Sequence, residues 1–169
     1  MIDTTTSSQI RTPFRFQPFE DRDQQRQHLI KTFGVDHLMM MGKTYPVEAL
    51  TCTGAYSDGD DPDAIVFWTT KLPLALLVAV ISVSATRGAA RALIDHVRSE
   101  SKLLGAKRLR ALTTNDNMAA LKFYQLYGFR LNSIFVGALD MMRVLHPTLP
   151  KLGHDNIPRR DTIELELDL

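Results

Sequence analysis

Residues 74–81 form an uninterrupted apolar run, and this run constrains the possible folds more than any other part of the sequence. It is too short to cross a membrane, because a spanning helix needs about 20 apolar residues. Residues 74–83 show no alternation of apolar and polar side chains, which is typical of a strand covered on both faces. We therefore predict a central strand in a sheet that carries other elements on both faces.

An amphipathic helix is predicted to follow this strand, from Arg87 onward. Its inner face repeats every three or four residues and consists of Ala90, Ile94, Val97, Ser101 and Leu104. The opposite face carries Arg91, Asp95, Arg98 and Lys102. Gly105 can adopt the left-handed conformation that ends a helix, so this helix has a defined end.

The other patterns predict an alternation of strands and helices. Strands are expected at residues 14–20, 48–56, 64–70, 107–113, 129–136 and 163–169, and helices between Asp21 and Gly34, between Asn117 and Tyr127, and at 138–146. The stretch 38–45 fits either a helix or a flexible wall, with Met39, Met40 and Met41 expected in the core. These elements predict an α/β fold in which a mixed sheet has helices on its faces. Residues 1–12 are expected to be a flexible tail before one domain at 13–169.

Charge and cysteine content exclude several classes of function. Twenty basic and nineteen acidic side chains leave a formal charge of +1 without long runs of either sign, so we expect neither a nucleic-acid partner nor a membrane partner. Cys52 is the only cysteine, and the first residues contain no apolar stretch of the kind that secretion signals have. We expect a cytoplasmic location, with the nucleus as an alternative. The five histidines show no paired spacing typical of metal sites, so no metal is expected.

The segment that joins the apolar strand to the amphipathic helix has the composition of a phosphate-binding loop. It is rich in Ser, Ala and Gly, whose small side chains let the backbone approach a ligand closely. Consecutive backbone amides at the start of a helix bind anions, and Arg87 and Arg91 add positive charge there. The segment therefore fits a pyrophosphate site. A tight connection between a strand and a helix would explain the same residues.

A second motif lies one helix and one strand further along, and the pair resembles the Gcn5-related N-acetyltransferase (GNAT) family. The first motif of that family fits here at Gly88 and Ala90, whereas Ala85 stands where a Gln or Arg is usual. The second motif matches in full at Asn117, Ala120, Tyr124, Gly128 and Phe129. One branch of the family is also similar at residues 113–117, 137–138 and 157–158 and in the acidic, leucine-containing end of the chain.

The resemblance implies a single domain with a mixed, mostly antiparallel central sheet flanked by helices, and acetyl-CoA as the acyl donor. The pantetheine arm would bind near Val80, and Asn117 would also contact the donor. The pyrophosphate would bind at Thr86, Arg87, Gly88, Ala89, Ala90 and Arg91. Tyr124 would protonate the departing thiolate, although its place on the helix also suits a tyrosine of the core. The acceptor would be the amine of a small molecule or a protein.

Two departures from the family pattern leave an alternative open. Ala85 removes one possible phosphate contact, and no acidic residue occurs between Asp63 and Asp95 to serve as the general base. Glu48, His37 and Asp140 could reach a cleft, but each is explained more simply as a surface or structural residue. The alternative is therefore an acetyl-CoA-binding protein with little or no turnover, which acts as a sensor or a partner subunit. An interaction domain without an acyl-CoA site is a third reading.

The last strand alternates apolar residues with Glu164, Glu166 and Asp168, which predicts one solvated face. Either its own sheet covers this strand, or the strand pairs with a second copy of the chain, because an exposed strand edge is a template for pairing. A homodimer is possible on this ground. Cys52 lies outside both motifs and is expected to be a small buried residue, not a nucleophile.

Overall fold

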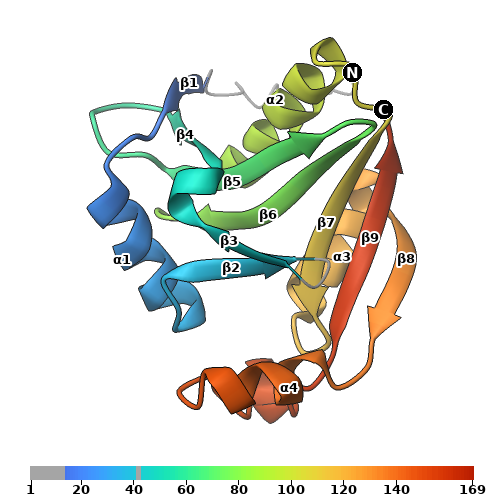
Figure 1. The fold of residues 1–169 in the computed structure, drawn as a ribbon. Helices are drawn as coiled ribbons and strands as arrows, with labels where there is room; N and C mark the ends of the chain where they lie inside the picture. The colour runs from blue at the N-terminus through green and yellow to red at the C-terminus, as the bar shows by residue number, and fades with distance from the viewer. Residues whose placement is uncertain (1–13, 41–42) are drawn as a thin grey trace, which may run out of the picture.

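The computed structural model describes residues 14–40 and 43–169, and a seven-stranded sheet forms its framework (Figure 1). In spatial order the strands are β1 (Arg15–Pro18), β4 (Thr51–Tyr56), β5 (Ala64–Lys71), β6 (Leu74–Ser82), β7 (Arg108–Thr114), β9 (Thr162–Asp168) and β8 (Arg130–Phe135). Only the pair β6 and β7 is parallel, while the other neighbouring strands run antiparallel. The fold is thus α/β with a mixed, mostly antiparallel sheet, and β6 occupies its centre as the apolar run predicts.

Two apolar clusters cover the two faces of the sheet. On one face, α2 (Ala89–Leu103) and α3 (Met118–Tyr127) pack on side chains that include Val66 and Leu77. On the other face, α1 (Arg22–Phe33) and the hairpin of β2 (His37–Met40) and β3 (Lys43–Pro46) pack on side chains that include Phe67 and Leu76. Neighbouring residues of β5 and β6 therefore enter different cores. This explains why β6 shows no alternation of apolar and polar residues.

The strands β6 and β7 pair only at one end and then separate. Their parallel ladder runs from Leu74 opposite Arg108 to Leu77 opposite Ala111 and stops there. At the same level the pairing of β6 with β5 shifts, because adjacent residues of β5 face Leu77 and Ala79 and leave Val78 as an extra residue. Such a bulge bends the strand that carries it. From Val78 to the end of β6, the edge that faces β7 has no ladder partner among the described residues.

The helix boundaries agree with the capping signals in the sequence. Asp21 caps α1 by accepting hydrogen bonds from the backbone N–H groups of Asp23 and Gln24, and Gly34 ends the helix with a positive φ of 79°. Asn117 caps α3, and Gly128 ends it with a φ of 115°. Side chains that accept from free N–H groups start a helix, and glycine tolerates the left-handed ending. The last helix, α4 (Ala138–Leu145), lies near the open ends of β7 and β9 (Figure 1).

Several predictions of local structure need correction or completion. Residues 38–40 and 43–45, left open between a helix and a wall, belong to the hairpin β2–β3. Met40 is buried there and Met39 is half-buried, whereas Met41 and the predicted tail at 1–12 lie outside the described residues. Leu104 is 53% exposed, because α2 already ends at Leu103 and turns Leu93 into the core instead. The predicted solvated face of β9 is wrong at Glu164, which is 2% exposed because the side chains of Arg110 in β7 and Asn132 in β8 lie against it. Its own sheet thus covers the last strand.

Candidate active site

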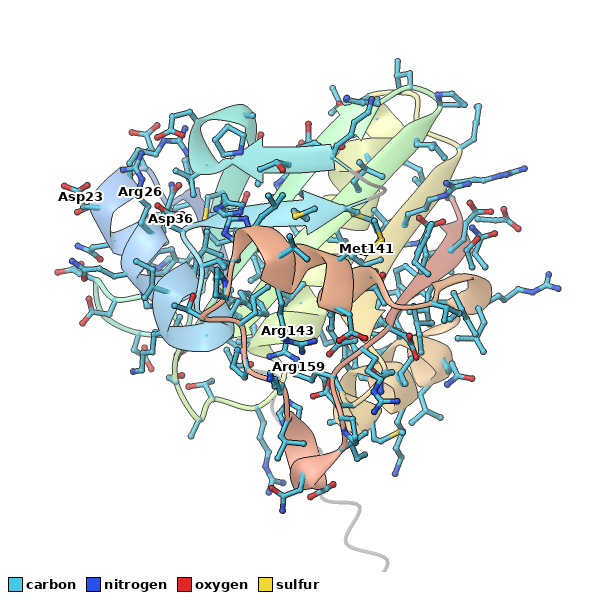
Figure 2. All side chains as sticks on the ribbon, turned by 60° about the horizontal axis from the view of Figure 1, so that its bottom comes forward. Asp23, Arg26, Asp36, Met141, Arg143 and Arg159 are labelled. Carbon is cyan, nitrogen blue, oxygen red and sulfur yellow. The ribbon has the colours of Figure 1, made fainter. Side chains whose placement is uncertain are left out.

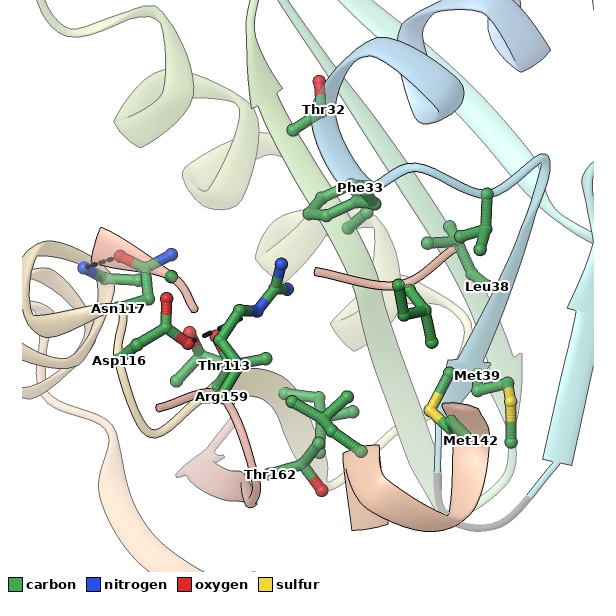
Figure 3. Close-up of a pocket in the computed structure, with 18 of the residues that line it drawn as sticks. Thr32, Phe33, Leu38, Met39, Thr113, Asp116, Asn117, Met142, Arg159 and Thr162 are labelled. Atoms are coloured by element: carbon green, nitrogen blue, oxygen red, sulfur yellow. Dashed lines mark hydrogen bonds and ion pairs between the residues drawn. The ribbon is translucent and has the colours of Figure 1, made fainter. Parts of the chain in front are cut away.

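The gap between β6 and β7 opens into a cavity of about 460 Å³ (Figure 3). Its walls come from both diverging strands, the end of α1, the strand β2, the helices α3 and α4, and the loop between α4 and β9. The lining includes Val78, Ala79 and Val80 of β6 and Leu112, Thr113 and Thr114 of β7. Backbone groups of β6 that have no ladder partner therefore lie beside a space that is large enough for a small-molecule ligand.

Tyr124 faces this cavity from α3, one turn after Ala120, which also lines it. The tyrosine is 7% exposed, and its ring packs edge-on against Phe123 and Phe129. Burial raises the pKa of the Tyr124 phenol to about 12. The phenol therefore stays protonated at neutral pH and can donate a proton to a stronger base formed beside it.

Asn117 and Val80 line the same cavity as Tyr124. The side-chain oxygen of Asn117 accepts a hydrogen bond of 3.0 Å from the backbone N–H of Ala120 and thereby caps α3. Three residues that the sequence predicts to contact the donor or the thioester thus meet at one place. The other predicted donor-binding residues, 86–91, lie beyond the end of β6 and do not line this cavity.

The loop between β6 and α2 is held by one carboxylate, that of Asp63. This side chain accepts hydrogen bonds from the hydroxyl groups of Ser57, Ser84 and Thr86 and from the backbone N–H of Ser57. The hydrogen bonds from Ser57, Thr86 and Ser84 hold the pKa of Asp63 well below its ordinary value. Thr86 also donates its backbone N–H to the Ser84 hydroxyl, so its backbone and hydroxyl donors both have partners within the protein.

The amino terminus of α2 follows this loop and has the character of an anion site. Gly88 adopts a φ of 91°, a conformation that favours glycine, and no side chain caps the helix there. The first turn contains no acidic residue, and Arg87, Gly88 and Arg91 are exposed. The guanidinium of Arg91 lies 5.0 Å from the centre of the Tyr127 ring. In the first turn of α2, Ala89 is buried and Ala90 is half-buried. A ligand at this site would therefore contact their backbone groups, not their side chains.

A polar network ties the turn before α3 to the loop before β9. The Asn115 side chain accepts from the backbone N–H groups of Arg160 and Asp161 and donates to the carbonyl of Pro158. Asp161 in turn accepts from the backbone N–H of Gly137. The segments 113–117, 137–138 and 157–158 therefore form one hydrogen-bonded unit. The sequence pointed to these segments only through resemblance, and the contacts now give the physical reason for it.

Asp116 and Arg159 form a buried ion pair on the polar side of the cavity (Figure 3). The Asp116 side chain is 2% exposed, and its Oδ1 lies 3.5 Å from Nε of Arg159. Burial alone would raise the pKa of Asp116, but hydrogen bonds from Thr114 and the His154 backbone, together with the Arg159 charge, lower it. From the sequence, Asp116 stands out only as part of residues 113–117, and Arg159 is missed because no local pattern joins two residues so far apart in the chain.

Of the three residues considered for a general base, only His37 lines the cavity. Its Nδ1 lies 3.0 Å from an oxygen of Asp36, and its Nε2 lies 3.2 Å from Nε2 of His146. Glu48 forms an ion pair with Arg26, and Asp140 forms one with Arg143 at 2.6 Å. Both ring nitrogens of His37 are thus engaged, and Glu48 and Asp140 have structural partners.

The described residues offer no group of three or more His, Cys, Asp or Glu side chains arranged to hold a metal ion. Cys52 is buried, and burial raises the pKa of its thiol to about 12, as expected for a packing residue. None of the helices in residues 14–40 and 43–169 is long and apolar enough to cross a membrane.

Residues 74–129, from the start of β6 to the residue after α3, match the model of the acetyltransferase (GNAT) family. This segment, which contains both sequence motifs, is similar to the GNAT family. The uncharacterized protein YxbD of Bacillus subtilis (strain 168) is 27% identical over 139 residues, which are 82% of this chain and 87% of YxbD.

Solved structures of acetyltransferases share the fold at low sequence identity. A Bacillus subtilis acetyltransferase in complex with CoA is 20% identical, with a TM-score of 0.69 over 93% of this chain and 99% of that one. The ribosomal-protein-S18-alanine N-acetyltransferase of Escherichia coli is 17% identical, with a TM-score of 0.63 over 92% of this chain and 94% of that one. All the predicted site residues lie inside the GNAT segment, whereas Arg159 and the loop before β9 lie outside it.

In the folded protein the hydrogen bonds to Asp63 stabilise its ionised carboxylate. The substitution Asp63→Asn should therefore lower the free energy of unfolding above pH 4. The pKa of this group is near 3.9 when unfolded and lower when folded, so its contribution is fully present at neutral pH and is lost as the pH falls below about 4. Urea unfolding at pH 7, 5 and 3 checks this, with Asp60→Asn in the same exposed turn as the control. The prediction would be contradicted if the free energies of unfolding of the wild type and Asp63→Asn differed by the same amount at all three pH values.

Proposed function

We propose that the protein transfers an acetyl group from acetyl-CoA to the amine of a small molecule or a protein. The observation that carries this proposal is the meeting of Val80, Asn117 and Tyr124 at one cavity, in a segment that matches the GNAT family. The unpaired edge of β6 supports a donor site, since its free backbone groups can bind an extended amide chain such as pantetheine. The uncapped amino terminus of α2 with Arg87 and Arg91 supports a pyrophosphate site.

In the proposed reaction, the lone pair of a neutral amine attacks the thioester carbonyl carbon. The carbon–sulfur bond breaks as the tetrahedral intermediate collapses, the thiolate takes the phenol proton of Tyr124, and the proton lost by the amine goes to solvent. Tyr124 then regains a proton from solvent. Burial raises the pKa of Tyr124 to about 12, so the phenol carries its proton at neutral pH when the thiolate forms beside it.

An acetyl-CoA-binding protein without turnover is the second candidate. The cavity lining holds one carboxylate, Asp116, which is already paired with Arg159, and both ring nitrogens of His37 have partners. Asp116 and His37 are therefore not free to act as a base, and the exposed His154 is the other histidine of the described lining. Turnover with a free amine would reject this candidate.

Acetyl-CoA should raise the midpoint of thermal unfolding, because it binds only the native state. The stabilisation is about 2.7 kcal/mol at a hundredfold excess over Kd. Gly88→Glu should abolish the shift, since it places a carboxylate at the anion site. Gly59→Glu is the matched control, because Gly59 also has a positive φ and open space around it but lies in a distant turn. Loss of the shift in both variants, or in neither, would contradict the proposed donor site.

Tyr124→Phe should lower kcat about 100-fold or more and leave the Kd of acetyl-CoA unchanged, because it removes only the proton of the general acid. Tyr127→Phe provides the control. Burial also raises the pKa of Tyr127 to about 12, but its hydroxyl donates to Asp95 and it does not line the cavity. Steady-state kinetics with the free thiol as readout, together with calorimetry, would separate the two effects. An equal fall in kcat for both variants would argue against the assigned role.

A further inference from the structure

The guanidinium of Arg159 points into the cavity and has no partner for its two terminal nitrogens among the described residues (Figure 3). The side chain is 18% exposed, and its Nε is buried without a hydrogen bond. A guanidinium carries five N–H donors, and leaving buried donors unsatisfied is costly. Arg159 therefore has an ion-pair partner at Nε, and its two terminal nitrogens can bind a ligand in the cavity.

The nearby Asp116 orients Arg159 but does not satisfy it. Its Oδ1 is 3.5 Å from Nε, which is too long for a good hydrogen bond, and both of these atoms are buried without one. Its Oδ2 accepts from the backbone N–H of His154 at 3.0 Å. Gly153 also packs so closely that a Cβ there would lie 1.9 Å from Oδ2. Asp116 is thus fixed in place, and it leaves the far end of the Arg159 fork free.

The neighbouring Arg143 shows what a structural arginine looks like in this loop. It donates to the carbonyls of Leu149, Pro150 and Arg159 and pairs with Asp140. Figure 2 shows Arg143 and Arg159 close together below α4. The N–H groups of Arg143 therefore hydrogen-bond to the loop, and one of these bonds fixes the backbone of Arg159. The Arg159 side chain is then left to the cavity.

The rest of the cavity is divided into a polar and an apolar side. Asp116, Asn117 and Arg159 gather on one side, and apolar side chains form the other, as Figure 3 shows. Phe33, Leu38, Met39 and Met142 lie on the apolar side, and the lining also includes Val35, Leu139 and Leu149. Met39, Leu112, Met142 and Thr162 also line a second, apolar cavity of about 330 Å³. The second cavity is therefore adjacent to the first.

We propose that Arg159 binds a carboxylate of the acceptor, and that the acceptor is an amine with both a carboxylate and an apolar body, as in an apolar amino acid. This inference rests on the proposed function, because it names the acceptor of that reaction. A guanidinium fork matches a carboxylate with two parallel hydrogen bonds. The apolar body would lie along Met39 and Met142. The amine then attacks the acetyl carbon, the carbon–sulfur bond breaks, and the N-acetyl product keeps its carboxylate on Arg159.

Binding of the reaction product tests this inference without the acyl donor. The probes are the N-acetyl derivatives of leucine, methionine and phenylalanine and their C-terminal amides, and calorimetry measures their Kd. The wild type should bind each acid about 10- to 100-fold more tightly than its amide, which is the range expected for a charge-assisted hydrogen bond. Arg159→Gln should abolish this preference. Arg160→Gln is the control, because Arg160 is adjacent in the chain and exposed.

Arg159→Gln leaves Asp116 buried without its cation and so could fail to fold. The double variant Asp116→Asn with Arg159→Gln removes both charges and should fold while lacking the preference. The inference is overturned if the wild type binds the acids and their amides equally tightly, or if it binds none of the six probes. It is also overturned if a folded variant without Arg159 still prefers the acids.

The proposed function can fail separately from this inference. If acetyl-CoA produces no thermal shift but the acids bind through Arg159, the donor assignment is wrong and the carboxylate site stands. If acetyl-CoA binds and the acids show no preference over amides, only the acceptor assignment is wrong. The two measurements use the same wild-type protein and no shared ligand.

Discussion

The separation of β6 from β7 is the constraint on which the rest of the site depends. The two strands share a ladder as far as Leu77, and the extra residue Val78 then bends β6 away. Backbone N–H and C=O groups on the free edge must find partners elsewhere, because buried polar backbone groups are rarely left unpaired. The same separation opens the cavity that Tyr124 and Asn117 face. One bulge in a buried strand thus provides both a hydrogen-bonding edge and a space beside it.

The buried side chain of Asp63 and the half-buried side chain of Asn115 hold the irregular segments around this opening. Asp63 binds the loop before α2 through the hydroxyl groups of Ser84 and Thr86, and Asn115 binds the loop before β9 through backbone groups of residues 158–161. Loops lack the regular hydrogen bonds of helices and strands, so such side chains replace them. Asp63 directly precedes β5 and Asn115 directly follows β7, so the two loops are anchored to different strands. This keeps the two sides of the opening in fixed positions. The charged pair of Asp116 and Arg159 lies where these supports meet the cavity.

Local patterns in the sequence were sufficient for most of the framework. The apolar run of β6, the periodicity of α2 and the capping residues Asp21 and Asn117 each express a rule that acts over a few residues. The β2–β3 hairpin could not be decided in this way, because its apolar residues pack on β6 and show no clear period. Glu164 was assigned to a solvated face for a related reason, since alternation does not reveal that β8 lies beside β9. Arg159 was missed because its meaning comes from contacts with Asp116, which only the fold creates.

Amide hydrogen exchange of β6, resolved by residue, would test the central claim that the free edge of this strand binds the acyl donor. The account predicts that saturating acetyl-CoA slows exchange at the amides between Val78 and Ser82 that face β7. Exchange at the outer edge strand β8 should not change, because that edge lies away from the cavity. Unchanged exchange in β6 with the donor bound, or protection confined to β8, would contradict the account.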